Sequence, residues 1–145
     1  MVEQDNELGL RRTVGKVAEL EDKIAENPLS GNIGVAHTRW ATHGGVTEAN
    51  AHPHLSGGRV AVIHNGIIEN FQPIKEELIA KGYEFKSETD TEVAAHLVHD
   101  FLKQGLDLIE AVRRSVLRFE GAYALLVCDA QDPDRIVVSR VASPL

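Results

Sequence analysis

The chain has 145 residues, 43% of them hydrophobic and 26% charged, with a formal net charge of −7, which is the size and composition of one folded globular domain and excludes a disordered or fibrous chain. No stretch gathers the basic residues, so the charge pattern predicts no nucleic-acid partner. The longest apolar run, residues 122–128, is far shorter than the roughly 20 residues of a membrane-spanning helix, and residues 1–25 lack the apolar core of a secretory signal, so we expect a cytoplasmic protein without a membrane span.

The first half of the chain predicts a helix, two short strands and a long loop. Apolar residues at helical spacing predict the helix over residues 14–25. Residues 33–37 and 59–64 are predicted strands, and residues 38–56 between them have the Gly, Pro and polar side chains of a loop. Asn65 and Gly66 follow the second strand directly, and this pair is a strong turn signal.

Two helices are predicted next. Asn70 is the expected N-cap of a helix over residues 71–81, and Asp90 or Thr91 is the expected cap of a helix that ends near residue 104. Apolar residues share one broad face of this second helix, so its polar residues, His96 and His99 among them, are expected in solvent.

The remaining residues predict a third helix and a strand pair. Asp107 and Glu110 resemble a capping box for a helix that ends at Gly121 and buries a stripe made by Ile109, Val112, Val116 and Phe119. Residues 122–128 are apolar without alternation, as in a strand buried on both faces, and residues 132–134 turn the chain into a partner strand at 135–139. Strands before and after a run of helices predict an α+β fold with a largely antiparallel sheet.

The single cysteine, Cys128, lies inside this apolar strand. One cysteine excludes an internal disulfide framework and leaves Cys-based zinc motifs unavailable. Reactive thiolates occupy electropositive and partly exposed surroundings, so we expect Cys128 to be a small core residue rather than a nucleophile.

Arg39 and its neighbours form the first candidate site. The planar guanidinium group of Arg39 suits a carboxylate or a phosphate, while Trp40, Thr42 and His43 offer an aromatic wall and hydrogen-bonding groups. The residues alone give equal support to an alternative, in which Arg39 makes a surface ion pair and Trp40 packs in the core.

Asn65, Gly66 and Asp90 form a second set of candidates. A turn is the commoner role of an Asn-Gly pair, and the functional alternative is that the Asn65 amide and the Gly66 backbone N–H stabilise a developing oxyanion. Asp90 is by default a helix N-cap, and in the functional interpretation its carboxylate pairs with a ligand ammonium.

Five of the seven histidines lie between residues 37 and 64, which raises the hypothesis of a metal site. These residues are His37, His43, His52, His54 and His64. They lack the i, i+4 helical pair of a zincin and a supporting cysteine, so the sequence predicts no metal site.

Four motifs together resemble one known family. They are residues 37–44 (HTRWATHG), 50–54 (NAHPH), 64–70 (HNGIIEN) and 87–92 (SETDTE), in the same order as in the glutaminase domains of glucosamine-6-phosphate synthases. These domains are class II amidotransferases, and the resemblance extends from about Val14 to the end of the chain. It implies an incomplete four-layer αββα sandwich of the N-terminal-nucleophile hydrolase type, with mostly antiparallel sheets.

The same resemblance assigns roles to the candidate residues and implies no cofactor and no metal. Arg39 would hold the α-carboxylate of L-glutamine and Asp90 its α-ammonium group. The pocket would be lined by Trp40, Thr42 and His43, and the oxyanion hole would be formed by Asn65 and Gly66. In the family, an N-terminal cysteine attacks the glutamine carboxamide and ammonia leaves.

This chain departs from the family at that nucleophile, because it opens with Met1 and Val2 and has no other cysteine than Cys128. We therefore expect residues 1–145 to be a partial glutaminase domain, without the first strand and the C-terminal part, that binds L-glutamine but does not turn it over alone. Fructose 6-phosphate is implied only through isomerase domains absent from this sequence. An open sheet edge would favour a homo-oligomer. The alternative function is a nucleophile-free amino-acid-binding or interaction module.

Overall fold

The computed structural model describes residues 7–31, 33–41 and 43–143. Their regular elements, in chain order, are α1 (Val17–Glu26), β1 (His54–Ser56), β2 (Val60–Ile68), α2 (Phe71–Ala80), α3 (Thr91–Lys103), α4 (Leu108–Val116), β3 (Gly121–Asp129) and β4 (Asp132–Val141). The strands form one sheet in the order β1-β2-β3-β4, and every neighbouring pair is antiparallel. The predicted α+β class and antiparallel sheet are confirmed.

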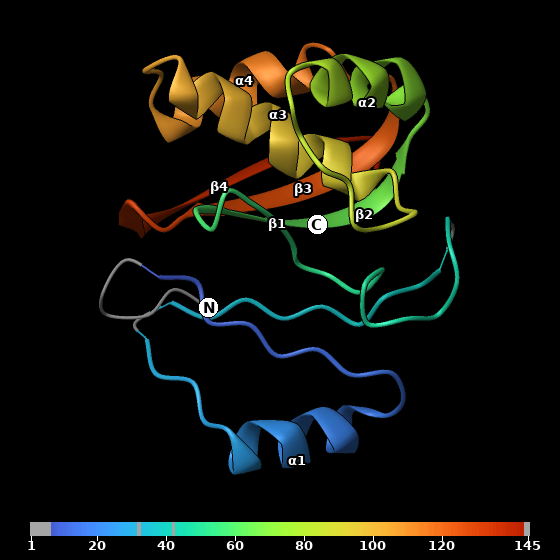
Figure 1. Ribbon diagram of the computed structural model, residues 1–145, viewed down its shortest axis with the longest axis vertical. Helices are drawn as coiled ribbons and strands as arrows, with labels where there is room; N and C mark the ends of the chain where they lie inside the picture. Colours follow the sequence, from blue (N-terminus) through green and yellow to red (C-terminus); the bar gives the residue numbers. More distant parts are fainter. Residues whose placement is uncertain (1–6, 32, 42, 144–145) are drawn as a thin grey trace.

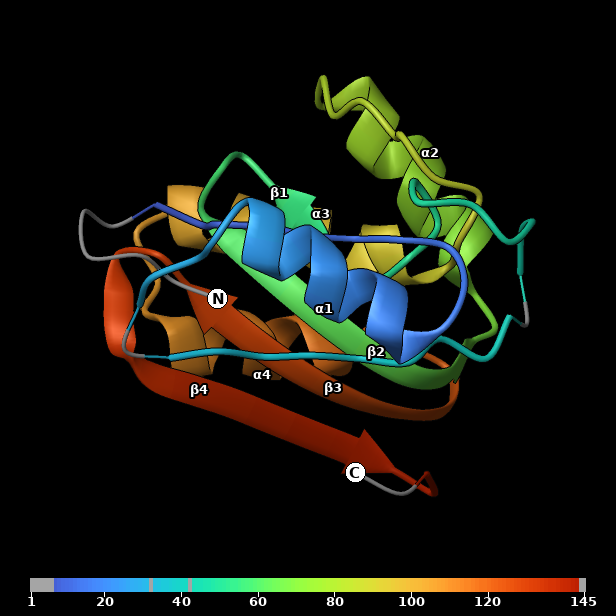
Figure 2. The same ribbon diagram turned by 90° about the horizontal axis from the view of Figure 1, so that it is seen from below.

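The elements are stacked in layers on the two faces of this sheet (Figure 1). Helices α2, α3 and α4 cover one face, whereas on the other face two extended segments, near residues 7–13 and 33–41, run between the sheet and α1. Figure 2 shows the same order from below, with α1 nearest the viewer. The layer order is that of the expected αββα sandwich, but in the part of the chain that the structure describes only one of the two inner layers is a hydrogen-bonded sheet.

The main core lies between the sheet and the helices. Alternate residues of β2 and β3 point to this side, so their branched side chains pack against the apolar face of α3. The fully buried members include Val62, Ile68, Val93, Leu97 and Leu125. Helix α3 lies between α2 and α4 and packs against β2.

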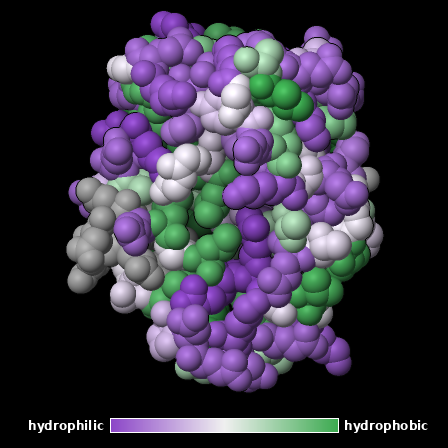
Figure 3. Space-filling model, in the orientation of Figure 1, coloured by the Kyte–Doolittle hydropathy of each residue, from purple (hydrophilic) through white to green (hydrophobic). Residues whose placement is uncertain are grey.

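A smaller apolar cluster lies on the opposite face of the sheet. Cys128 and Ala61 are buried there, with Leu8 and Val35 of the extended segments packed against them. The prediction that Cys128 is a core residue is therefore confirmed. On the side of the molecule drawn in Figure 3, apolar surface is visible between the helical layer and α1. The two extended segments therefore cover the apolar side chains between the sheet and α1 only in part.

Three predictions in the first half of the chain need correction. The strand predicted at residues 33–37 is not formed: Ile33 is assigned to an isolated bridge, and residues 34–37 are extended without a ladder partner among the described residues. The predicted loop over residues 38–56 ends early, since its last three residues form β1 and pair with β2. The predicted turn at Asn65 and Gly66 is wrong: β2 continues to Ile68, with these two residues opposite Ala124 and Tyr123 of β3.

Helix boundaries and faces differ from the prediction where side chains make long-range contacts. The Asn70 side chain makes no cap hydrogen bond and instead joins the carbonyl of Arg118 to the amide of Glu120. The face of α3 that was expected in solvent is buried in its first part, where His96 is only 6% exposed and bonds to Ser56 Oγ at 2.8 Å, whereas His99 is half-buried and Lys103 is exposed.

The third helix is confirmed at its start and shorter than predicted at its end. Asp107 caps α4, because its carboxylate accepts a 2.8 Å hydrogen bond from the amide of Glu110. The helix ends at Val116, while Gly121 begins β3, and Ile109 is exposed rather than part of the buried stripe. The hairpin turn also lies earlier than predicted, since β4 already begins at Asp132. No helix among the described residues is long and apolar enough to cross a membrane.

Candidate functional site

A cavity of about 230 Å³ opens where β2, the N-terminus of α3 and the extended segment around residue 40 meet. Its lining consists of His37, Arg39, Trp40, His43, His52, His64, Asn65, Gly66, Ile67, Thr89, Asp90 and Thr91. Every site residue predicted from the sequence lines this cavity except Thr42, which lies outside the described residues. Segments far apart in the chain thus bring an arginine, a buried carboxylate and an Asn-Gly pair to one place.

Arg39 enters from the extended segment and is held by its own loop. Its guanidinium group donates to the carbonyl of Gly45 at 2.8 Å, to that of Gly44 at 3.3 Å and to that of His43. None of its described partners is a carboxylate, so the described residues give no support to the interpretation as a surface ion pair. Trp40 is 87% exposed at the rim, which also corrects the expectation that it packs in the core.

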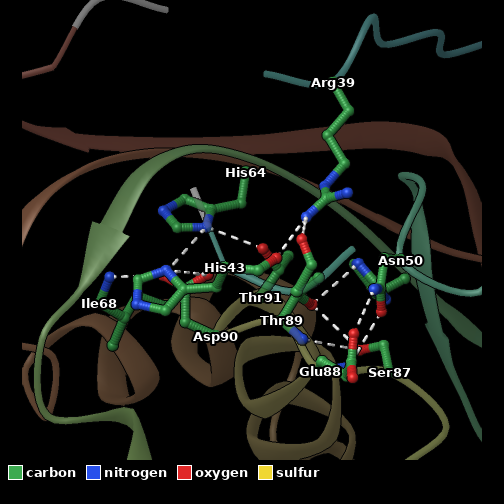
Figure 4. A network of polar contacts seen from close by, with 12 residues as sticks. Arg39, His43, Asn50, His64, Ile68, Ser87, Glu88, Thr89, Asp90 and Thr91 are labelled. Atoms are coloured by element: carbon green, nitrogen blue, oxygen red, sulfur yellow. Dashed lines mark hydrogen bonds and ion pairs between the residues drawn. The ribbon is translucent and has the colours of Figure 1, made fainter. Parts of the chain in front are cut away.

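The loop that follows Arg39 is tied to the segment before α3. Glu88 accepts hydrogen bonds from the amide of Gly45 at 3.1 Å and from Asn50 Nδ2 at 2.9 Å, and its own amide donates to Asn50 Oδ1 at 2.9 Å. Hydrogen bonds from Asn50, and from the Gly45 backbone, lower the pKa of Glu88, so this carboxylate stays ionised. Asn50 and Glu88 therefore set the distance between the Arg39 loop and α3 (Figure 4).

Asp90 is buried at the N-terminus of α3, with only 3% of its surface exposed. It occupies the N-cap position but makes no cap hydrogen bond; its Oδ2 accepts from the backbone amide of Ile68, across the site, at 2.8 Å. His43 Nδ1 lies 3.9 Å from Oδ1, and His64 Nδ1 lies 3.8 Å from Oδ2. The predicted N-cap position is therefore confirmed, but the carboxylate makes no cap hydrogen bond and is instead fixed at the wall of the cavity (Figure 4).

Asn65 and Gly66 lie inside β2, where the strand passes the cavity. The Asn65 carbonyl accepts from Ser143 Oγ at 3.2 Å. Gly66 has φ +121°, and a Cβ atom at this position would lie 2.8 Å from Tyr123 Cα and closer still to the Ala122 carbonyl oxygen. Only glycine fits this close approach of β2 to β3, so Gly66 is required by the backbone itself.

Four histidines line the cavity, of which His64 is buried, and sequence reasoning did not group them with Thr91. The Thr91 hydroxyl lies 2.9 Å from His64 Nδ1 and 3.1 Å from His52 Nε2. Burial and neighbouring positive groups, His54 and His37 first among them, lower the pKa of His52 to about 2. Thr91 directly follows Asp90 in the 87–92 motif, and that adjacency is the only sequence signal that could have identified it.

The metal hypothesis receives no support from these rings. In the ranges that the structure describes, no group of three His, Cys, Asp or Glu side chains is arranged to hold a metal ion. The His52 and His54 rings meet edge to face at 5.1 Å between centroids, and His54 Nε2 bonds to Thr89 Oγ1 at 3.1 Å. These histidines hydrogen-bond to hydroxyl groups instead of converging on one point.

Comparison with known proteins agrees with the site. Residues 37–141 match the family described as the glutamine amidotransferase domain. Over its whole length the chain is 58% identical to a glutamine–fructose-6-phosphate aminotransferase (isomerizing) of Idiomarina loihiensis, and it is 56% identical over 142 residues to that of Pseudomonas putida. It covers 24% and 23% of those proteins, so it spans about a quarter of the length of these relatives.

Two solved structures share part of the fold. Glutamine phosphoribosylpyrophosphate amidotransferase of B. subtilis, solved with ADP and GMP, superimposes on 65% of this chain with a TM-score of 0.52 and 30% identity, and the chain covers 20% of it. An allosteric regulatory enzyme of purine biosynthesis gives a TM-score of 0.54 and 33% identity over 65% of this chain, covering 21% of that structure. The chain therefore belongs to the glutamine amidotransferase domain family, in the form carried by glutamine–fructose-6-phosphate aminotransferases.

Proposed function

We propose that the cavity binds L-glutamine as a zwitterion. The observation that carries this proposal is the placement of the buried Asp90 carboxylate and the Arg39 guanidinium on one cavity. A carboxylate taken out of water needs a cationic partner, and the α-ammonium group of an amino acid supplies one. The α-carboxylate would then replace the loop carbonyls as the acceptor for the planar donors of Arg39, with Trp40 and His43 beside it. Thr42 belongs to the same proposal through the motif alone.

The glutamine side chain would extend toward Asn65 and Gly66. There, the Asn65 amide and the Gly66 N–H would donate to the carboxamide oxygen as it becomes an oxyanion, a contribution of about 3 to 4 kcal/mol per donor in comparable sites. A thiolate attacks the carboxamide carbon, the C–N bond breaks, and ammonia leaves after taking up a proton. Water then hydrolyses the thioester to glutamate and frees the thiol.

These 145 residues are proposed to supply the pocket and the oxyanion hole but not the thiol. Cys128 lies opposite Ala61, four positions along β3 from Ala124, the partner of Asn65, which is roughly 13 Å of strand. Burial also raises the pKa of the Cys128 thiol. A residue that is buried, protonated and distant from the oxyanion hole does not serve as the nucleophile, so the chain alone should not hydrolyse glutamine.

Fructose 6-phosphate enters this proposal only through the relatives. Their name says that they use glutamine and fructose 6-phosphate, and the matched part is about a quarter of their length. We infer that ammonia released at this site would be used by isomerase domains outside these residues. Within the 145 residues, glutamine is the one proposed substrate, and neither a cofactor nor a metal is required for its hydrolysis.

Titration calorimetry with L-glutamine tests the pocket. We expect binding by the unmodified chain and a loss of roughly 1.5 to 3 kcal/mol in Arg39→Ala and in Asp90→Asn, because each removes a charged hydrogen-bonding partner. Arg135→Ala is the matched control, since Arg135 is exposed on β4 and, among the described residues, its ion pair is with Asp132. Equal affinity in all four proteins would refute the assignment, and ammonia release by the purified chain would refute the absence of a nucleophile.

The alternative, an amino-acid-binding or interaction module, shares the pocket and differs in what the chain does with it. The buried position of its only cysteine favours this alternative for the chain alone. Adding a polypeptide that carries the family's N-terminal cysteine strand separates the two: recovery of ammonia release supports the glutaminase, and binding without turnover under those conditions supports the module.

A further inference from the structure

Thr91 occupies an unusual position for the first residue of a helix. Its side chain is 1% exposed and lies between two histidine rings, with Oγ1 2.9 Å from His64 Nδ1 and 3.1 Å from His52 Nε2. A hydroxyl group carries one proton, so it can donate to only one of these nitrogens. The other nitrogen must carry a proton and donate to Thr91, and the tautomers of the two rings are therefore linked.

The negative charge of the Asp90 carboxylate determines which of the two histidine nitrogens carries the proton. Its Oδ2 lies 3.8 Å from His64 Nδ1, which is too far for a hydrogen bond but close enough for its negative charge to favour an N–H at that nitrogen. His64 Nδ1–H then donates to Thr91 Oγ1, and the Thr91 hydroxyl donates to His52 Nε2. In this arrangement Thr91 Oγ1, and not Asp90, accepts the His64 proton; Figure 4 shows both residues beside the His64 ring.

We propose that the Thr91 hydroxyl holds His64 neutral, with its proton on Nδ1, and thereby keeps the Asp90 carboxylate open for the ammonium group of the ligand. Thr91 is on this account a positioning residue, which acts through His64 and Asp90. The inference rests on the proposed function for its ligand, because the open carboxylate matters only if Asp90 binds an ammonium group.

The surroundings of His64 agree with a neutral ring that would change charge if Thr91 were lost. His64 is 3% exposed; Asp90 faces it from the N-cap position of α3, and His37, His43, His52 and His54 face it from the segments before β2. Burial lowers the pKa of His64, with His37 and His43 acting in the same direction and Asp90 acting against them. Without the hydroxyl, Asp90 is the remaining acceptor for Nδ1–H, so an ion pair between the two would raise the pKa of His64 and occupy the carboxylate.

Long-range ¹H–¹⁵N NMR of the unmodified chain tests the tautomer directly, without any substitution. We expect the His64 proton on Nδ1 and the His52 proton on Nδ1 at about pH 7. A His64 proton on Nε2, or a charged His64 ring at that pH, would overturn the proposal. This measurement does not depend on glutamine binding, so it separates a failure of this inference from a failure of the proposed function.

Substitutions then test the consequence for Asp90. In Thr91→Val, which keeps the shape and removes the hydroxyl, we expect His64 to titrate at higher pH and glutamine to bind roughly tenfold more weakly, the equivalent of a weak charge-assisted hydrogen bond. Thr91→Ser should restore both properties. Ser115→Ala is the control, because it also removes a buried helical hydroxyl, which donates to the Ala111 carbonyl in α4 and does not line the cavity. Unchanged His64 titration in a folded Thr91→Val, or a Thr91→Ser that behaves like Thr91→Val, would refute the proposal.

Discussion

The substitution Gly66→Ala tests the close approach between β2 and β3 at the cavity. An L-residue at positive φ costs about 1 to 2 kcal/mol, and the φ of +121° at Gly66 is far from the left-handed helical region. The new methyl group would also overlap the β3 backbone at Ala122 and Tyr123, which adds about 1 to 3 kcal/mol, as overpacking does elsewhere. We therefore expect Gly66→Ala to lower the free energy of unfolding by about 2 to 5 kcal/mol.

Gly58→Ala is the matched control for this experiment. Gly58 also has a positive φ, +64°, but a Cβ atom there would meet no atom within 4 Å. The same substitution changes the entropy of the unfolded chain equally in both variants, so this contribution cancels in the comparison. Gly58→Ala should cost about 1 to 2 kcal/mol, which leaves a difference of about 1 to 3 kcal/mol for the overlap with β3.

Equilibrium unfolding in urea measures both variants. Equal m-values would show that the comparison concerns stability and not a change in the unfolded state. If Gly66→Ala and Gly58→Ala lose the same free energy, the β3 backbone does not restrict position 66 and the argument from geometry fails. If Gly66→Ala retains its stability but loses glutamine binding, the glycine is needed for the ligand alone.

Other predictions concern pH, the thiol and the sheet edge. Burial lowers the pKa of His52 to about 2 and that of His54 to about 4. Between about pH 6.5 and pH 5 these histidines therefore take up protons in the unfolded chain but not in the folded chain. The free energy of unfolding, measured by urea titration, should fall as the pH is lowered from about 7 to 5. His54→Asn should reduce this slope, and an unchanged slope would contradict the assignment. Cys128 should react with a thiol reagent only as the protein unfolds, whereas rapid labelling of the native chain would show an exposed thiol. Val138 is 51% exposed on the edge strand β4, and an exposed apolar strand edge favours association. Light scattering should therefore show a homo-oligomer, and Val138→Lys should weaken it. A monomeric unmodified chain would refute this prediction.

Local signals in the sequence predicted those features that local contacts determine. Asp107 caps α4 because its partner, the Glu110 amide, is three residues away. The apolar run around Cys128 forms the buried strand β3, as a continuous apolar segment without polar alternation predicts. In both places the information needed lies within a few residues, so reasoning from the sequence was sufficient.

Predictions were wrong where a partner far along the chain provides a better contact than a local one. Asn70 bridges Arg118 and Glu120 instead of capping α2. Glu92, expected in solvent, accepts hydrogen bonds from Ser87 and the Lys86 amide while the helix face around it is buried. No pattern along one helix shows that its polar face will be covered by another segment, because periodicity reports amphipathicity and not the identity of the neighbour.

The failed predictions at the cavity differ from these in one physical respect. Asn70 does not cap α2 and Glu92 is not in solvent, but each makes hydrogen bonds to other protein groups, Asn70 to the Arg118 carbonyl and Glu92 to Ser87. Asp90 also makes no cap hydrogen bond. Among the described residues, its Oδ2 accepts one hydrogen bond, from the Ile68 amide, and its Oδ1 lies 3.9 Å from His43 Nδ1. Trp40 remains exposed at the rim, although its apolar surface would be more stable in the core. Both of these residues lie on the same cavity, and on the proposed function a bound ligand would add the contacts that their local preferences lack.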